Sequence, residues 1–176
     1  MDSEKNRIIE VVNYNANWKS EYKKETKRLK YIFQPIATSI HHIGSTSIPG
    51  MLAKPTIDIL IEVSKIDKVD TFNELMKEAE YQIEGEYGIK GRRYFWKYPG
   101  NHKYHIHVFE KNDKNIIRYL AFKAYLIQNK KRAKEYGGLK KYLADKYPHS
   151  IKKYMDGKND LIKKIEKEAL RWQSKN

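Results

Sequence analysis

The chain has 176 residues, 40% of them hydrophobic, which allows one domain with a real core and excludes two full-sized ones. It contains no cysteine, which excludes disulfides and thiolate metal sites and agrees with a cytoplasmic location. Its net charge of +14, from 36 Lys and Arg against 22 Asp and Glu, favours anionic partners such as nucleotides or RNA. Lysines spread along helices are also typical of solvated helix faces, so the charge by itself leaves both interpretations open.

Neither a signal peptide nor a membrane span is expected. Residues 1–5 carry no apolar stretch and no small-residue cleavage site. The apolar run at residues 57–63 is interrupted by charges and is too short to cross a bilayer. We therefore expect a cytoplasmic protein without a membrane partner, whose oligomeric state the sequence leaves open.

The first elements alternate between strand and helix. Residues 7–12 read as a short strand, residues 18–33 as an amphipathic helix and residues 36–43 as a strand that ends at Gly44. The clearest strand spans residues 55–63, where Ile57 and Ile59 share one face and Asp58 and Leu60 share the other.

The second half predicts further strands and then helices. Residues 69–81 have helical spacing, and residues 82–87, 92–98 and 104–111 read as strands joined by turns that favour antiparallel pairing. Three apolar stripes follow from residue 113 onward, with Asp156-Gly157 as the break before the last.

The order of these elements indicates the fold class. A doubly wound parallel sheet needs a helix between every strand pair, and residues 82–111 leave no room for one. We expect an α/β (α+β) mixed-sheet core at about residues 1–112. A helical C-terminal portion, at about residues 113–176, should cover the open face of the sheet within the same single domain.

Residues 41–50, HHIGSTSIPG, suggest a phosphate-binding turn. Gly44 allows close backbone approach, and the hydroxyl groups and free amides of the turn can bind phosphate oxygens. The hydroxyl residues are Ser45, Thr46 and Ser47. We expect one of the two preceding histidines, His41 and His42, to face the cleft and the other to pack or be solvated.

The strand after this turn carries Asp58, preceded by Lys54. A phosphate-binding turn beside a carboxylate is what metal-dependent phosphoryl chemistry requires, because the carboxylate holds the ion that bridges the phosphates. Such turns are common at protein surfaces, and it is the neighbouring carboxylate that strengthens the interpretation.

Residues 42–59, HIGSTSIPGMLAKPTIDI, resemble the signature block of the GrpB-like family, also called UPF0157. Residues 93–97, residues 105–108 and the helical end resemble later parts of the same family, so the similarity covers nearly the whole chain. The resemblance implies the nucleotidyltransferase-like fold of the polymerase-beta superfamily, with Gly44 and Ser45 before a strand that bears the metal carboxylate Asp58.

The sequence departs from the superfamily pattern at one position. That pattern places a second carboxylate one residue beyond the first, but position 60 is Leu60. Glu62 shares the face of Asp58, yet four residues at ~3.3 Å each put it ~13 Å away. A standard two-metal mechanism is therefore in doubt.

Two histidines offer replacement ligands. If Ile106 and Val108 face the core, His105 and His107 point the same way as Asp58 and make a His₂-carboxylate set. Such a set favours Mn²⁺, Zn²⁺ or Fe²⁺ over Mg²⁺. Ordinary polar cleft or surface histidines are the alternative. Lys54 and Arg93, with Arg92 and Lys97 as further candidates, could offset phosphate charge; the alternative is that each is an ordinary cation of an edge strand or loop.

Two functions follow from these residues. The first is transfer of a nucleotidyl group from an NTP to an acceptor, with a divalent metal (Mg²⁺, Mn²⁺ or Zn²⁺) on Asp58. The second is a non-catalytic module that binds a nucleotide, another phosphate-bearing small molecule or RNA after losing the second carboxylate.

Overall fold

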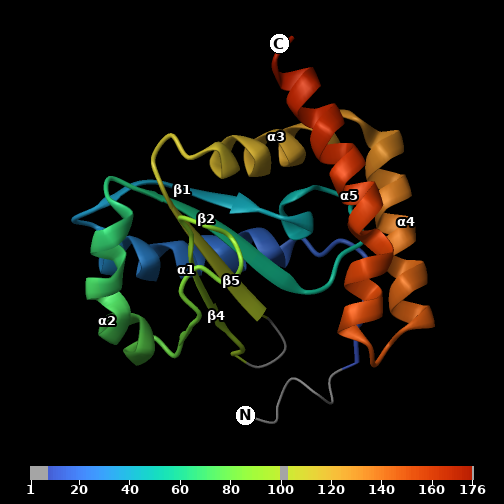
Figure 1. Ribbon diagram of the computed structural model, residues 1–176. Coiled ribbons are helices and arrows are strands. Elements are labelled where there is room, and N and C mark those ends of the chain that lie inside the picture. The colour runs from blue at the N-terminus through green and yellow to red at the C-terminus, as the bar shows by residue number, and fades with distance from the viewer. Residues whose placement is uncertain (1–7, 100–102, 176) are drawn as a thin grey trace.

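The computed structural model describes residues 8–99 and 103–175 (Figure 1). Three sequence expectations fall outside these ranges: the N-terminal residues 1–5, Arg7 at the start of the first predicted strand, and residues 100–102 of a predicted turn. In the described part of the chain, no helix has both the length and the apolar character needed to cross a membrane.

Five strands form one mixed sheet in the order β1-β2-β5-β4-β3. β2 and β5 pair in parallel, whereas the other neighbours are antiparallel. This arrangement confirms the predicted fold class and the predicted antiparallel pairing of the later strands. The strands are β1 (Ala37–Ile43), β2 (Thr56–Val63), β3 (Gln82–Ile83), β4 (Arg93–Lys97) and β5 (Lys103–Glu110).

Helices cover both faces of the sheet (Figure 1). α1 and α2 lie on one face, and α3 lies on the other. α4 and α5 stand side by side beyond the end of the sheet (Figure 1). The α-helices are α1 (Asn17–Phe33), α2 (Asn73–Glu78), α3 (Lys114–Gln128), α4 (Lys130–Lys146) and α5 (Ile151–Gln173), and the 3₁₀ helices are η1 (Ser45–Ser47) and η2 (Ile66–Phe72).

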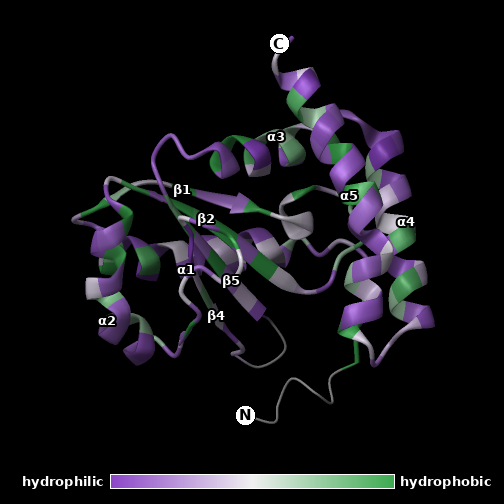
Figure 2. Ribbon diagram, viewed as in Figure 1, coloured by the Kyte–Doolittle hydropathy of each residue, from purple (hydrophilic) through white to green (hydrophobic). Residues whose placement is uncertain are grey.

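The main core lies between the sheet and α1. The odd-numbered residues of β2, Ile57, Ile59 and Ile61, are fully buried against Leu29 and Phe33 of α1. Burying each such side chain contributes roughly 1.5–3 kcal/mol. Figure 2 shows green along much of β2, while the helices mix green and purple, as expected of helices with one buried and one solvated face. The alternation of β2 therefore sends its even-numbered residues to the opposite face.

On that opposite face, Leu60 and Phe109 pack against Ile116 of α3. α4 and α5 make separate clusters with other segments: Tyr154 packs with Val11 near the N-terminus, and Ile165 packs with the loop that follows η1. Of the C-terminal helices, which were predicted to cover the open face, α3 therefore covers it. α4 and α5 lie beyond the end of the sheet.

Two expected strands are shorter than predicted. Within residues 8–12, pairing is limited to a single bridge from Val12 to Ala53. β3 ends at Ile83. Glu84 and Gly85 still hydrogen-bond to Tyr94 of β4, and the positive φ values of Gly85 and Tyr87, 58° and 43°, then turn the chain away from the sheet.

Two helix boundaries also differ from expectation. Residues 66–72 form a 3₁₀ helix before α2, since a spacing of three suits both helix types. Asp156-Gly157 does not break a helix but lies inside α5. A Cβ on Gly157 would stand 2.5 Å from Cδ2 of Leu143, so glycine here allows α5 to approach α4 closely.

Candidate functional site

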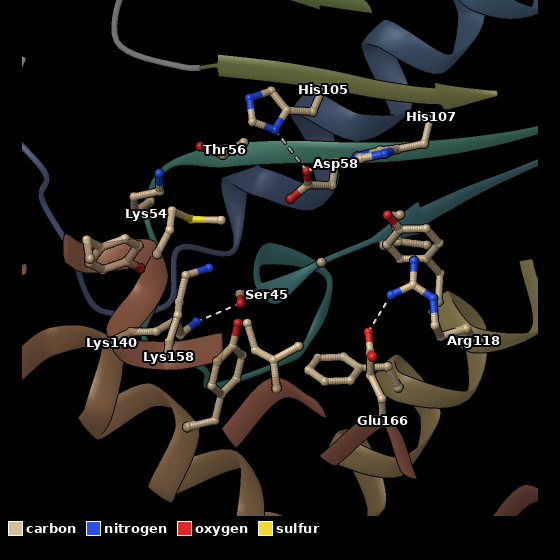
Figure 3. Close-up of a pocket in the computed structure, with 18 residues that line it drawn as sticks. Ser45, Lys54, Thr56, Asp58, His105, His107, Arg118, Lys140, Lys158 and Glu166 are labelled. Carbon is tan, nitrogen blue, oxygen red and sulfur yellow. Dashed lines mark hydrogen bonds and ion pairs between the residues drawn. The ribbon is translucent and has the colours of Figure 1, made fainter. Parts of the chain in front are cut away.

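A pocket of about 360 Å³ lies between the sheet and the three C-terminal helices (Figure 3). Its walls come from both halves of the chain, which are distant in sequence. Six of the residues predicted from the sequence line it, namely Gly44, Ser45, Lys54, Asp58, His105 and His107.

Asp58 meets both histidines within this pocket. The parallel register of β2 and β5 sets Asp58 beside His105, and His107 follows two residues along the same face. Asp58 Oδ1 lies 3.2 Å from His105 Nδ1 and 3.5 Å from His107 Nε2. Potential ligand atoms of the three residues all lie within 4.8 Å of one another, a spacing that fits the predicted metal site.

The environment keeps Asp58 ionised. Burial raises the pKa of its carboxyl group, but the hydrogen bonds and charges of His105 and His107 outweigh burial and hold that pKa well below its usual range. Burial lowers the pKa of His107, although Asp58 acts in the opposite direction. An ionised carboxylate in a pocket fits a hard divalent cation.

The carboxylate of Asp58 also leaves no space for a side chain at position 44, which is Gly44. Its φ of 70° lies in the left-handed region. A Cβ at this position would stand 2.4 Å from Asp58 Oδ2. The turn can therefore approach Asp58 only with glycine here, and the predicted close approach of the Gly44 backbone to a phosphate stays a prediction.

The three hydroxyl residues of the turn have different roles. Ser45 lines the pocket, whereas the other two hydroxyls hold the turn together. Thr46 is buried and donates to the carbonyl oxygen of Thr56 at 2.9 Å. Ser47 donates to the carbonyl oxygen of Gly44 at 2.7 Å. The hydroxyls of Thr46 and Ser47 are predicted to bind phosphate, but in the structure that of Thr46 is directed to the start of β2 and that of Ser47 back into the turn.

Arg93 does not lie in the pocket, so its predicted place in the site was wrong. It pairs in register with Val108, which places it on the α1 side of the sheet, opposite to Asp58. There its guanidinium makes two hydrogen bonds, of 2.7 and 2.8 Å, to the carboxylate of Asp70. The strand alternates faces, so it is the neighbour Tyr94 that lies beside His107. Lys97 shares the face of Arg93 and pairs with buried Glu25 at 2.7 Å.

The two predicted histidines before the turn separate. His42 is buried on the α1 side, where Tyr22 stacks on its ring at a centroid distance of 4.6 Å. Burial, followed by the charge of Lys123, lowers the pKa of His42 to about 4. His41 lies on the other face, where its Nε2 is 2.7 Å from Glu62. His41 thus shares a face with Asp58 but does not line the pocket.

Two lysines that the sequence reasoning did not assign complete one wall of the pocket. Lys140 of α4 is 2% exposed and donates to Ser45 Oγ at 2.6 Å. Lys158 of α5 and Lys54 lie on the same side of the pocket in Figure 3. Among residues 8–99 and 103–175, no carboxylate forms an ion pair with Lys140 or Lys158. We call these three residues the lysine cluster.

An aromatic ring lies near each ammonium group of the lysine cluster. Lys140 Nζ lies 4.5 Å from the ring centroid of Tyr136, and Lys158 and Lys54 lie 5.2 and 5.4 Å from that of Tyr154. Burial, followed by the charges of its lysine neighbours, lowers the pKa of Lys140 to about 7. Burial and the charge of Lys54 lower that of Lys158 to about 8. Three cationic side chains thus share one wall of the pocket, an arrangement that can receive an anion.

A pattern in the sequence points to both lysines. Lys140 falls on the apolar stripe of α4, four residues after Tyr136 and three before Leu143. Lys158 likewise follows Tyr154 by four residues on the stripe of α5. A lysine on a buried helical stripe must be neutralised or bind an anion, because burying an isolated charge is costly.

The far side of the pocket has a different character (Figure 3). Arg118 of α3 and Glu166 of α5 form an ion pair of 2.5 Å there. The aromatic rings of Tyr119 and Phe122 line the same pocket. The pocket therefore runs from a cationic wall to a wall with a paired charge and flat rings.

The model of the family described as GrpB protein matches residues 8–168 of the chain. The UPF0157 protein YqkA of Bacillus subtilis is 47% identical over 94% of this chain, which spans about half the length of that relative. The glutamate-rich protein GrpB of Alkalihalophilus pseudofirmus is 36% identical, over 88% of this chain and 92% of its own.

Solved structures agree with the fold. The crystal structure of the conserved protein GrpB from Enterococcus faecalis matches with a TM-score of 0.89 and 42% identity, over 93% of this chain and 99% of that one. The Cid1 poly(U) polymerase with Mg 3′-dATP bound matches with a TM-score of 0.53 and 11% identity, over 84% of this chain and 49% of that one. The likeness to Cid1 shows a nucleotidyltransferase-like fold.

Proposed function

The chain belongs to the GrpB family, and we propose that it is a metal-dependent nucleotidyltransferase, which transfers a nucleotidyl group from an NTP to an acceptor and releases pyrophosphate. The observation that carries the proposal is the lysine cluster with Ser45 on one wall of a pocket and an ionised carboxylate, Asp58, on another. This combination suits a triphosphate with a bridging cation.

Each wall has a separate task in the proposed reaction. Ser45 and the lysine cluster hold the phosphates and offset their charge as the pyrophosphate leaves. Asp58 is the residue that would hold the divalent ion, which would supply positive charge to offset the phosphates. The rings of Tyr119 and Phe122 offer flat apolar surfaces to the nucleobase or to the acceptor.

The comparison with Cid1 supports the same choice of substrate. The solved structure of that polymerase holds Mg 3′-dATP, and its fold resembles this one. A cytoplasmic location, where NTPs are abundant, agrees with the cysteine-free sequence.

One observation favours a second candidate function, a nucleotide- or RNA-binding module without turnover. Leu60, where the superfamily pattern has its second carboxylate, is fully buried against Ile116 of α3. No metal ligand can operate from that position, so catalysis has to proceed with fewer protein carboxylates.

A transfer assay distinguishes the two functions. Purified protein is incubated with each α-labelled NTP, Mg²⁺ or Mn²⁺, and candidate acceptors including RNA, and pyrophosphate release and labelled product are both measured. The proposal predicts turnover that falls by about 100-fold or more in Asp58→Asn, which keeps the shape and removes the charge. NTP binding without turnover across all acceptors would support the binding module.

A further inference from the structure

The two histidines beside Asp58 have surroundings that differ from those of metal ligands. A histidine that binds a metal through one ring nitrogen normally donates the other N–H to a carboxylate, a carbonyl or water. The partners of the second ring nitrogens of His105 and His107 therefore indicate what these residues do.

The second ring nitrogen of His107 contacts a hydrogen-bond donor, whereas that of a metal-binding histidine normally contacts an acceptor. Its Nδ1 lies 3.3 Å from Nη1 of Arg92, and an arginine can only donate. His107 Nδ1 must therefore accept, and a neutral ring then carries its proton on Nε2. That Nε2 is the atom that faces Asp58 Oδ1. In this tautomer Nε2 has no lone pair for a metal.

Arg92 is held firmly in this role. It is 5% exposed, and its other nitrogens donate to the carbonyl oxygens of Glu86 at 3.2 Å and Tyr87 at 2.6 Å. Its guanidinium also lies 4.8 Å from the ring centroid of Tyr94. A guanidinium fixed by three contacts cannot readily turn away from His107.

The surroundings of His105 also differ from those of a metal ligand. Its Nδ1 faces Asp58 Oδ1 at 3.2 Å, while its buried Nε2 has no hydrogen-bond partner among residues 8–99 and 103–175. A bond from Nδ1–H to Asp58 satisfies the nitrogen that carries the proton and leaves only an acceptor unpaired. Ligation through Nδ1 would instead leave an N–H buried and unpaired, which costs more.

Both histidines converge on one oxygen of Asp58. The other oxygen, Oδ2, lies against Gly44 at the start of the phosphate-binding turn. Figure 3 shows the dashed bond from His105 to one oxygen, while the second oxygen of Asp58 points into the pocket. An ion on Oδ2 would stand between the carboxylate and phosphates held by Ser45.

We infer that His105 and His107 are positioning residues that donate to Asp58 Oδ1, and that the metal binds Asp58 Oδ2 and substrate phosphate oxygens without nitrogen ligands from the protein. The inference rests on the proposed function only for the phosphates. An all-oxygen site favours Mg²⁺ or Mn²⁺, in contrast to the preference for Mn²⁺ or Zn²⁺ that a His₂-carboxylate set predicts.

The first test reads the tautomer without any turnover. Two-bond ¹H–¹⁵N spectra are recorded on ¹⁵N-histidine-labelled protein above the ordinary pKa of imidazole, and His107 is assigned from its missing signals in His107→Gln. We expect the Nε2–H form of His107, unchanged when Zn²⁺ is added. Arg92→Met should convert this single form into a mixture of tautomers. An Nδ1–H form in the unsubstituted protein, or loss of the Nε2 proton with Zn²⁺, would overturn the inference.

The second test uses amides that keep the donor but ligate metal poorly. Gln mimics the Nε2 of His107, and Asn mimics the Nδ1 of His105. In calorimetric titrations of Mg²⁺ and Mn²⁺ with a non-hydrolysable NTP present, His107→Gln and His105→Asn should stay within about threefold of the unsubstituted protein, whereas Asp58→Asn should lose at least about tenfold. Amide variants as weak as His105→Ala and His107→Ala would make the histidines ligands.

The two tests keep this inference separate from the proposed function. A protein that shows no transfer activity can still show the Nε2–H tautomer and insensitivity to zinc. An active enzyme whose His107 loses its Nε2 proton to zinc would keep the function and refute the inference.

Discussion

Lys140 places positive charge where the folded protein gains little from it. Lys140 is almost fully buried, and its nearest described partners are Ser45 and the ring of Tyr136 rather than a carboxylate. Burial of a cation without an ionic partner costs free energy of folding, and a bound anion can recover it. Lys140 is therefore expected to serve binding at the expense of stability.

Replacing Lys140 should separate these two effects. Lys140→Met keeps much of the volume and removes the charge, so we expect a higher melting temperature together with NTP binding weakened by about 10-fold or more. Calorimetric binding and thermal unfolding of the same preparations measure both. Lys141→Met is the matched control, because Lys141 is half-exposed and pairs with Asp145 on the surface. Equal effects of the two substitutions would contradict the assignment.

The lowered lysine pKa values also predict how NTP binding depends on pH. The pKa of Lys140 is lowered to about 7 and that of Lys158 to about 8, so both lose protons as pH rises through this range in the free protein. Phosphates favour the charged forms of the lysines. The affinity for NTP should therefore be highest near pH 7 and fall as pH rises towards 9. Binding that stays flat over this range would show that both lysines have ordinary pKa values.

The lowered pKa of Lys140 also makes folding stability depend on pH. Stability should rise with pH, whereas NTP affinity should fall. The folded-state pKa of Lys140 lies below its unfolded value of 10.5, so the unfolded chain binds more protons between these values. The contribution of Lys140 to stability should therefore rise with pH from about 7 to 10. Urea unfolding across this range should show a smaller rise for Lys140→Met than for the unsubstituted protein.

Among the elements, α4 and α5 depend on one glycine for their close packing. Gly157→Ala would bring a Cβ within 2.5 Å of Leu143, and we expect a loss of about 1–3 kcal/mol in the free energy of unfolding. Gly138→Ala is the matched control, because its Cβ would meet nothing within 4 Å and alanine favours a helix by up to about 1 kcal/mol. Chemical unfolding should give opposite signs for the two variants.

Strand β2 explains why the missing carboxylate cannot simply be restored. Leu60 shares the face of Asp58 but lies beneath α3, packed against Phe109. Leu60→Asp would bury a charge there, so we expect about 3 kcal/mol or more of lost stability and no increase in transfer activity. A stable and more active Leu60→Asp enzyme would show that position 60 can reach the metal.

The sequence predicted elements better than it predicted contacts between them. Alternation along β2 and β5 correctly placed Asp58, His105 and His107 on one face, because the side-chain period of a strand is two. Arg93 was placed wrongly because a five-residue strand gives little evidence of which residue faces which side. Lys140 was missed because the pattern of one helix does not reveal which pocket its polar member enters.

Across the whole molecule, the pocket depends on parts of the chain that are far apart in sequence. The sheet supplies Asp58 and its histidines, the turn after β1 supplies Ser45, and the C-terminal helices supply two of the three lysines. The carboxylate wall and the cationic wall face each other only in the folded protein. This arrangement is the basis for placing an NTP and its cation between them.

The most direct measurement of this claim is a crystal structure with Mn²⁺ and a non-hydrolysable NTP analogue, using anomalous scattering to locate the ion. We expect the phosphates against Ser45, Lys140 and Lys158, and a manganese peak bonded to Asp58. A nucleotide bound elsewhere on the basic surface, or a manganese ion away from Asp58 with the pocket empty, would contradict it.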